Sequence, residues 1–452
     1  MPDERISRRE FLRRGAAFGV SISALAGFLS SCAVTGTVEK SGGSAITIPI
    51  GASPWLPAFE TVTEAYEKET GNSVNLLIFP QDQLFSKQLL AADAGSEEYD
   101  VYTVTLANVG LFYDGGFATP LREVDPGFEW PSGIIGYDNE CRWDPAERFF
   151  ASDADVMGLP INGNVNLEYY RRDLYDEMDL KGPPETWDDV IAAARKARKK
   201  YGGDVYGYLV RGERGANAAS YDYMPLLSGF GGSIFADPPG DWSVVIDSEE
   251  ALEATDKWLE LATYGPPQPG VVTQGTMIGL MQSGQALHTH MTSAAALPLS
   301  DPTQTAVADK IDATVIPKPR NGEHATIAGG WLAVIPSHLE DSRKRPAYEF
   351  MDWVVRRDAQ MRYAEAKGIV SHAGVYESDL VEEKGFGGLK AIAQSLPYVV
   401  RGGYDCAFGP EVGYVMDRRL NEIISGLLTP RRGHDLMAVE ITRLAREAGF
   451  PA

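Results

Sequence analysis

The sequence predicts an α/β protein in which mainly parallel sheets are flanked by helices. The first observation is the order of residues 45–105, which alternates strand, helix, strand, helix and strand patterns. The second is the length of 452 residues, enough for two or three domains with their own cores. The third is an ordinary globular composition with 44% hydrophobic residues and no long apolar run after the N-terminal segment.

The first elements are short and clearly bounded. AITIPIGA (45–52) is a strand pattern, and the following helix pattern places Phe59, Val62 and Tyr66 on one face and ends at Gly71. Residues 73–80 and 99–105 are two more strands, with a helix over 83–96 between them. Ligands of such sheets bind beyond the carboxyl ends of the strands, so the residues after each strand are candidates for a site.

A stretch rich in Pro, Gly and Asp, residues 120–158, interrupts this order. Beyond it, Thr186 and Asp189 form a capping-box pattern at the start of a helix. The remaining predicted elements are a strand and helix over 158–178, a helix in 245–262, a helix and a buried strand in 275–294, strands at 312–319 and 326–336, one long helix over 345–368, and two helices in 409–449 divided at Thr429 and Pro430.

The first 31 residues are typical of an export signal. Arg8 and Arg9 precede Phe11 and Leu12 and an uncharged run over 15–29, which resembles a twin-arginine signal. Leu29-Ser30-Ser31-Cys32 resembles a bacterial lipobox, in which Cys32 would become the N-terminus and carry lipid. Residues 32–44 would then be a flexible tether. The alternative is an ordinary N-terminal amphipathic helix.

The net charge of -22 argues against a nucleic-acid partner or binding to an anionic membrane face. Apart from Cys32, the chain has two cysteines, Cys141 and Cys406. An oxidising compartment would permit a disulfide between them, and two separate buried thiols are the alternative.

The ordered set of later motifs carries a family resemblance. YEKETG before a strand, GLPINGNVNLEYYRRDLY before TWDDVIAAARK, and IAGGWLAVIP before RYAEAKG are similar to segments of the extracellular solute-binding proteins of sugar-type ABC importers. Maltose-binding protein is a distant member of that family. The resemblance extends from about residue 45 to residue 450.

The resemblance implies two α/β lobes of the periplasmic binding-protein type (type II-like), with the ligand in the cleft between them. It implies an N-terminal lobe of residues 45–160 plus 290–368 and a C-terminal lobe of 161–289 plus 369–452, with crossings near Pro160, His288 and Ile369. The expected partners are a carbohydrate and the membrane permease, without a cofactor, and the chain is expected to be a monomer. The expected location is outside the cytoplasm, on the outer face of the membrane or in the periplasm.

Sugars present an apolar face and a rim of hydroxyls, so aromatic and hydrogen-bonding side chains are the candidates. In the first lobe these are the residues that follow strands and the tryptophan of the Gly-Gly-Trp motif: Ser53, Trp55, Gln81, Asp82, Thr105, Asn108 and Trp331. Each has a structural alternative. Trp55 could begin a helix, Trp331 could pack in the core, and the polar residues could cap helices or turns.

In the second lobe the candidates come from four places. Asn162 and Asn164 share a face at a crossing and could hold the hinge instead. The Gly-broken loop VRGERGANAASYDY places Arg214 and Tyr221, with Arg211, Glu213 and Asn217, either at the cleft or in solvent. The remaining candidates are His290, Tyr404 and Asp405. His288 and His290 alternate along a strand, but the sequence shows no third metal ligand, so no metal site is expected.

The sequence lacks the GxSxG, HExxH and cysteine–histidine signatures of hydrolases. Carboxylate pairs such as Asp188-Asp189 fall at helix starts, where negative charge is favourable. We therefore expect a binding protein rather than an enzyme, with a neutral mono- or disaccharide or a polyol as its ligand. The arginine-containing loop leaves an acidic sugar open. The alternatives are an exported hydrolase and a lipid-anchored protein that acts on extracellular glycans.

Overall fold

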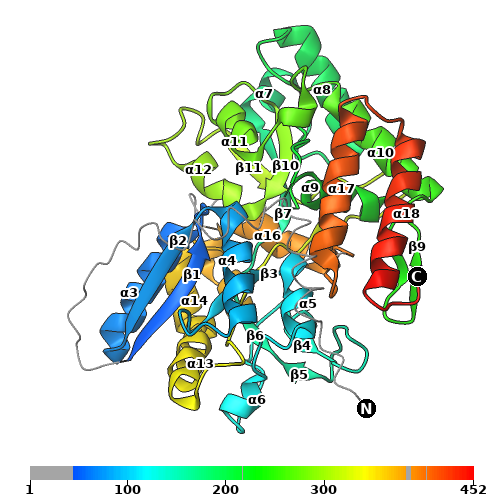
Figure 1. The fold of residues 1–452 in the computed structure, drawn as a ribbon. Coiled ribbons are helices and arrows are strands. Elements are labelled where there is room, and N and C mark those ends of the chain that lie inside the picture. The colour runs from blue at the N-terminus through cyan, green and yellow to red at the C-terminus, as the bar shows by residue number, and fades with distance from the viewer. Residues whose placement is uncertain (1–43, 216, 383–387, 404) are drawn as a thin grey trace, which may run out of the picture.

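The computed structural model describes residues 44–452 except 216, 383–387 and 404, and it does not describe the side chain of Asp82. The chain forms two α/β lobes, one built mainly from its first third and the other mainly from its middle and end (Figure 1). The predicted signal, Cys32 and the tether up to residue 43 lie outside the described residues. Within the described part of the chain, no helix is both long and apolar enough to cross a bilayer.

Two ladders lie side by side in the first lobe. The strands are β1 (Ala45–Gly51), β2 (Ser73–Phe79), β3 (Tyr102–Thr105), β6 (Gly158–Asn162) and β13 (Trp331–Val334). β1 and β2 are parallel, and the Asp100 amide donates to the Thr47 carbonyl, which aligns β3 with β1. β13 runs antiparallel to both β3 and β6. The predicted, mainly parallel sheet is therefore present, with one antiparallel strand that arrives from the other lobe.

The helices of the first lobe are α3 (Leu56–Thr70), α4 (Gln81–Ala94), α5 (Leu106–Asp114), α6 (Leu121–Val124), α13 (Asp341–Val355) and α14 (Arg357–Glu365), with the small ladder of β4 (Arg142–Trp143) and β5 (Asp155–Val156). The first two helices lie close to the predicted ranges, whereas α5 and α6 were not predicted. Gly71 ends α3 in the left-handed region. The single helix predicted over 345–368 is wrong, because Arg356 adopts an extended conformation and divides it into α13 and α14.

The second lobe also packs helices against a sheet, but its central three-stranded sheet is antiparallel rather than mainly parallel as predicted. β7 (Asn166–Arg171) lies antiparallel between β10 (His288–Thr292) and β11 (Ile311–Thr314). Its other strands are β8 (Phe235–Asp237), β9 (Asp241–Val244), β12 (Thr326–Ile327) and β14 (Val399–Val400). Its α-helices are α7 (Arg172–Glu177), α8 (Trp187–Tyr201), α9 (Ala219–Gly229), α10 (Glu249–Ala262), α11 (Gln274–Gln282), α12 (Ala296–Ser300), α16 (Leu389–Ser395), α17 (Gly409–Ile424) and α18 (Pro430–Glu447).

Short helical turns complete the chain. They are α15 (Ala373–Tyr376) and the 3-10 turns η1 (Pro269–Val271), η2 (Ser293–Ala295), η3 (Asp379–Glu382) and η4 (Leu396–Tyr398). The predicted capping box at α8 is confirmed, because Thr186 and Asp189 bond reciprocally through side chain and backbone. The two predicted C-terminal helices are also confirmed, with Thr429 capping α18.

The chain crosses between the lobes at three places. The first crossing follows β6, and the third lies near Ile369, whose carbonyl accepts from the Gly163 amide. The second was expected near His288, but β10 and β11 both pair with β7. That pairing favours a crossing between β12 and β13, close to residue 329, and places residues 290–328 with the second lobe.

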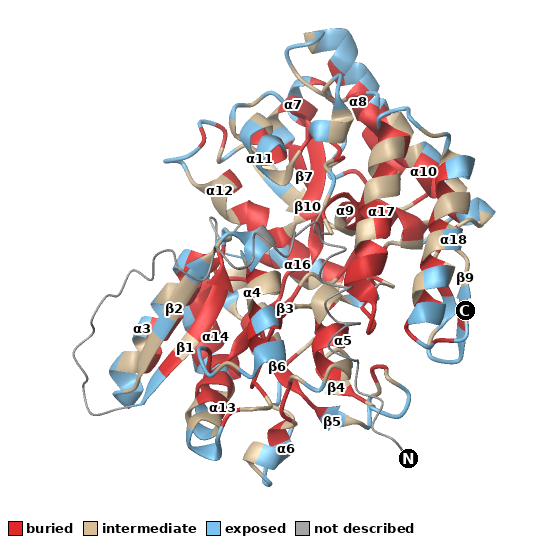
Figure 2. Cartoon of the chain, in the orientation of Figure 1, coloured by how far each residue is buried: buried red, intermediate tan, exposed pale blue. Residues whose placement is uncertain are grey.

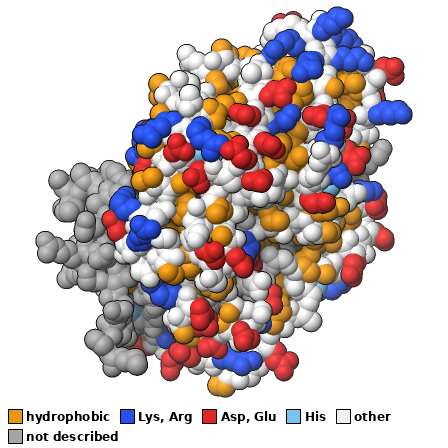
Figure 3. Space-filling view, turned by 90° about the vertical axis from the view of Figure 1, so that its right-hand side faces the viewer, with side chains coloured by type: hydrophobic (Ala, Val, Ile, Leu, Met, Phe, Trp, Pro, Cys, Tyr) orange, Lys and Arg blue, Asp and Glu red, His pale blue; other side chains and the backbone are white. Residues whose placement is uncertain are grey.

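Buried aromatic residues fill the space between sheets and helices. In the first lobe Phe59 lies edge-on to Phe350 and Tyr363, which ties α3 to α13 and α14. In the second lobe Trp187 lies edge-on to Tyr208. Figure 2 shows the strands and the inward faces of the helices buried, with exposed residues on the outer faces. Acidic and basic side chains are mixed on the face drawn in Figure 3.

Candidate functional site

The segment Gly329-Gly330-Trp331, which we call the crossing segment, joins the two lobes at the centre of the candidate site. The Gly329 amide donates to the Asn164 carbonyl at 2.7 Å. Trp331 opens β13, where it pairs with Thr105 on one side and Asn162 on the other. The crossing segment therefore brings the end of β3 next to the first crossing.

A tyrosine packs closely against each of the two glycines of the crossing segment, and the two tyrosines come from different lobes. A Cβ at Gly329 would overlap the hydroxyl of Tyr221, which belongs to α9 of the second lobe. A Cβ at Gly330 would overlap the ring of Tyr137, whose hydroxyl donates to the Asn164 carbonyl at 3.1 Å. Burial raises the pKa of both tyrosines, so both hydroxyls stay protonated. The lack of side chains at both glycines is what permits this close approach.

Trp331 and Trp55 pack against each other. Trp331 is 6% exposed and Trp55 is 1% exposed, and their ring centroids lie 5.7 Å apart. Trp55 also lies edge-on to Phe59 of α3. Both rings thus belong to the packed wall of the first lobe, and their contact with a ligand stays a prediction.

Of the polar side chains that follow the strands of the first lobe, some are hydrogen-bonded within the protein and others are not. Ser53 donates to the Gly51 carbonyl at 3.3 Å, and the amide of the exposed Gln81 folds over Gly51. Thr105 precedes α5 without capping it. Thr105 and Asn108 are half-buried, and neither side chain has a hydrogen bond within the described part of the chain. Thr105 and Asn108 are therefore half-buried predicted residues of this lobe whose polar atoms have no protein partner among the described residues.

Asn162 and Asn164 are hydrogen-bonded to protein partners at the first crossing. The Asn162 amide donates to the Tyr363 hydroxyl at 3.1 Å, and its oxygen accepts from the Asn164 backbone. The Asn164 side chain accepts from Ser293 at 3.3 Å. Both side chains therefore have protein partners, and their two predicted roles, in the hinge or at the ligand, stay predictions.

A polar cluster at the near edge of the second lobe consists of Asn166, Tyr221, Asp222 and Thr292. Asn166 and Thr292 pair across β7 and β10, and the Asn166 amide reaches Asp222 at 3.4 Å. The remaining side-chain oxygen of Asn166 and the Oδ2 of Asp222 are buried without hydrogen-bond partners among the described residues. Buried polar atoms are usually paired, so such atoms point to a ligand or to water.

The electrostatics of this cluster are set by burial and by Arg211. Asp222 is 2% exposed, and burial raises its pKa while Arg211 and His290 oppose that shift. The Arg211 guanidinium lies 4.0 Å from Asp222 and 2.7 Å from Glu213. Arg214, the arginine predicted to reach the cleft, is exposed. Asn166, Asp222 and Thr292 were not predicted, although Asn166 and Thr292 stand at strand ends, which is the signal that could have found them.

His290, which was predicted to contact ligand, lies in the core instead. Its ring nitrogens contact the Tyr208 hydroxyl and the Asp222 carbonyl. His288 similarly contacts Glu168 at 2.9 Å and Tyr175 at 2.8 Å. β10 places both rings in the core of the second lobe. There, neighbouring side chains and a backbone carbonyl lie within hydrogen-bonding distance of the ring nitrogens. The described residues contain no group of three or more side chains suited to a metal ion.

Asp405 is paired rather than open to a ligand. Its carboxylate lies 3.1 Å from Arg401, whose guanidinium also covers the ring of Phe149. Tyr404 lies outside the described residues. Glu140 faces this pair, and burial together with Asp405 raises its pKa to about 7. Nothing in the local sequence singles out Glu140, because only the fold brings it near Asp405.

Of the two alternatives left open for Cys141 and Cys406, the structure has two separate buried thiols and no disulfide between them. Cys141 and Cys406 are both free and buried. Cys141 follows Glu140, whereas the Cys406 backbone packs against Gly110 of α5 at a distance that excludes a side chain there. Burial raises the pKa of both thiols, which disfavours thiolate chemistry.

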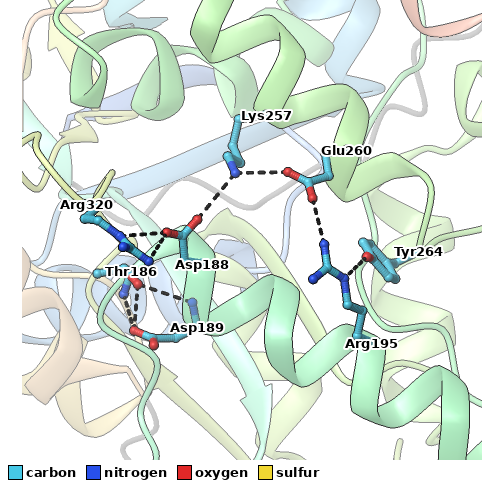
Figure 4. A network of polar contacts seen from close by, with 8 residues as sticks. All are labelled: Thr186, Asp188, Asp189, Arg195, Lys257, Glu260, Tyr264 and Arg320. Atoms are coloured by element: carbon cyan, nitrogen blue, oxygen red, sulfur yellow. Dashed lines mark hydrogen bonds and ion pairs between the residues drawn. The ribbon is translucent and has the colours of Figure 1, made fainter.

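The carboxylates at the start of α8 serve structure rather than catalysis (Figure 4). Asp189 closes the capping box, and Asp188 pairs with Arg320 at 3.0 Å and Lys257 at 3.5 Å. Lys257 continues to Glu260, which links α8 to α10. These acids therefore have partners and lie in a helix-to-helix network.

A separate hollow lies between the lobes. It is lined by Ser293, Ala296, Leu297, Ser300, Ala364, Lys367, Gly368, Ile369, Leu389 and Ile392. Its walls are mainly apolar, and they include none of the residues predicted to bind ligand. It therefore provides little for recognising a ligand rich in hydroxyls.

A family model decides the classification. The model of the bacterial extracellular solute-binding proteins matches residues 52–361. The chain belongs to this family. The solute-binding protein is 20% identical over 386 residues to the erythritol/L-threitol-binding protein of Mycolicibacterium smegmatis, covering 80% of each chain.

Solved structures agree with the fold of this solute-binding protein. A maltose-bound protein of T. maritima matches with a TM-score of 0.77 and 19% identity, covering 89% of this chain and all of that one. A solute-binding protein of Agrobacterium radiobacter K84 in complex with ribitol matches with a TM-score of 0.75 and 19% identity, covering 89% and 99%. These neighbours share the two-lobe architecture, so the predicted fold is confirmed.

Proposed function

We propose that this solute-binding protein captures a neutral carbohydrate, a mono- or disaccharide or a polyol, between its lobes and delivers it to an ABC permease. The observation that carries the proposal is the polar cluster, where buried oxygens of Asn166 and Asp222 have no hydrogen-bond partner among the described residues. Hydroxyl groups of a sugar or polyol would supply the missing donors. Relatives that bind erythritol, maltose and ribitol support the same ligand class.

The charges around the cluster favour a neutral ligand over an acidic one. Arg211 is the partly buried arginine nearest to the cluster, and Glu213 and Asp222 already balance its charge. An anionic ligand would also meet the Asp222 carboxylate. The opposite wall, with Trp55 and Trp331 beside Thr105 and Asn108, would offer apolar surface and hydroxyl partners to a sugar ring.

Closure of the lobes around the ligand would make the bound shape recognisable to the permease, so that binding energy becomes a population shift.

We further propose that the chain is exported through its twin-arginine-like signal, is anchored by lipid on Cys32 and acts as a monomer. The lobes that fit the strand pairing are 45–162 plus 329–371 and 163–328 plus 372–452. A non-enzymatic role follows from this function.

A thermal-shift screen of the chain from residue 33 onward tests the function. Neutral sugars, polyols, acidic sugars and amino acids would each be titrated, because ligand that binds only the native state raises the melting temperature. We expect a saturable rise with one neutral sugar or polyol, which is recovered intact. A rise with acidic sugars or amino acids alone would overturn the proposed ligand class. Chemical conversion of the sugar would favour the hydrolase alternative.

A further inference from the structure

Three residues of α17 form a stripe along one face of the helix. Gly413, Asp417 and Asn421 are spaced by four residues, which places them above one another on the helix. All three contact the loop of residues 210–218, of which residue 216 is not described. We call these three residues the α17 stripe and this segment the arginine loop. The loop leads directly into α9, which carries Tyr221 and Asp222.

Asp417 replaces the missing cap of α9. The residue before α9, Ala218, has no side chain that can cap it. Asp417 is fully buried, and its two oxygens accept from the backbone amides of Ala218 at 2.9 Å and Ser220 at 2.8 Å. These amides belong to the orphan donors of a helix N-terminus, where a carboxylate is most favourable. One side chain from a distant helix thus sets the position of the first turn of α9.

Asn421 holds the other end of the arginine loop. Its amide donates to the Gly212 carbonyl at 2.7 Å and to the Gly270 carbonyl at 2.8 Å. The second bond joins α17 to η1, so the same amide links η1 and the loop through α17. Asp417 and Asn421 therefore fasten both ends of the loop to one rigid element.

Gly413 makes room for Asn217 between these two attachments. A Cβ at Gly413 would overlap the side-chain oxygen of Asn217. Asn217 has a φ of 57°, a left-handed conformation that is uncommon for residues other than glycine. Its side-chain oxygen is buried without a hydrogen-bond partner among the described residues. A buried polar atom without a protein partner points to a ligand or to ordered water.

We propose that the α17 stripe positions Asn217 and the start of α9 for hydrogen bonding to the bound carbohydrate. This inference rests on the proposed function. Asn217 is the residue that contacts ligand, and Gly413, Asp417 and Asn421 are positioning residues that act through the arginine loop. Because α17 also packs against α5 of the first lobe, the same helix links the ligand loop to the opposite wall.

A double-mutant cycle between Gly413→Ala and Asn217→Ala tests the proposal. Affinities for erythritol, ribitol and maltose would be measured by calorimetry, at a temperature where every variant is folded. We expect each single substitution to weaken binding of the preferred carbohydrate by about tenfold. The double variant should be no weaker than Asn217→Ala, because Gly413 acts through that side chain. Multiplied effects, or unchanged binding by Asn217→Ala, would overturn the proposal.

Asp417→Asn supplies a second readout that needs no ligand. Hydrogen exchange in the unliganded protein should become faster at the Ala218 and Ser220 amides, while amides of the β7–β10 ladder keep their protection. Asp256→Asn, at an exposed position on α10, is the matched control and should leave exchange and affinity unchanged. Unaltered exchange in Asp417→Asn would show that the carboxylate does not hold the loop.

The two readouts separate this proposal from the proposed function. If the unchanged chain binds none of the three carbohydrates and no other sugar of the screen, the proposed function fails and the ligand role of Asn217 fails with it. The exchange experiment then still decides whether α17 holds the arginine loop. If the unchanged chain binds and the cycle is additive, only the positioning role is wrong.

Discussion

The indole rings of Trp55 and Trp331 lie 5.7 Å apart between centroids, at an angle of 56° to each other. The two residues are separated by most of the chain, and one follows β1 while the other opens β13. Their packing closes the first lobe at the crossing segment. This packing also makes both tryptophans part of the core, whether or not a ligand touches their edges.

Replacement of Trp331 by alanine should therefore destabilise the protein. Loss of a buried tryptophan costs about 3–5 kcal/mol of unfolding free energy, through lost burial and the cavity left behind. Urea unfolding of the unliganded chain would measure this loss. Trp130→Ala, at a half-buried position, should cost clearly less. Full stability in Trp331→Ala, with ligand binding lost, would instead show a ring that serves only the ligand.

Gly330→Ala should lower stability by about 1–3 kcal/mol, because its methyl group has no space beside the buried ring of Tyr137. Gly279→Ala is the matched control. Gly279 lies inside α11 with open space around it, so alanine there should stabilise by up to about 1 kcal/mol. Thermal unfolding of both variants would measure the difference. Equal stability of the two variants would contradict the tight approach of Tyr137 to the crossing segment.

The Asp417 carboxylate should give the stability a measurable pH dependence. Burial raises its pKa from 3.8 to about 6, against the hydrogen bonds from Ser220 and Ala218. The folded state then binds more protons than the unfolded state between these values, so this contribution favours folding at about pH 4 and is lost as the pH rises through about 6.

Asp417→Asn removes this titration. The unfolding free energy of the unchanged chain, minus that of Asp417→Asn, should fall by up to about 3 kcal/mol between about pH 4 and pH 7. Urea unfolding at several pH values would measure it, with Asp256→Asn as the control for removal of a charge. A difference that does not vary with pH would place the pKa of Asp417 at its ordinary value.

Both cysteines of the described chain should remain thiols in the exported protein. Cys141 and Cys406 are buried and unpaired, so a thiol reagent should react with neither in the folded protein and with both after unfolding. Intact mass under non-reducing conditions provides the second measurement. A mass lower by two hydrogens, with no reaction after unfolding, would show the disulfide that the structure lacks.

Local patterns predicted many elements of the fold, but not α5, α9 or the β8–β9 hairpin. Gly71 ends α3 and Thr186 caps α8 as predicted, because a left-handed glycine and a capping box depend on a few neighbouring residues. The break at Arg356 was missed, since the apolar periodicity continues through it. Local patterns also do not reveal strand pairing: β11 was expected in the first lobe, but it pairs with β7 of the second.

The sequence by itself determined the α/β class, the order of strands and helices, and the places where polar residues follow strands. Only the tertiary structure decided which of those polar residues already have partners. Asn162 meets Tyr363 and His290 meets Tyr208, whereas Asn166 and Asn217 keep unpaired oxygens. The physical reason is that a buried polar group is satisfied by whichever donor or acceptor the fold brings within about 3 Å. That partner lies far along the chain, so no local pattern reveals it.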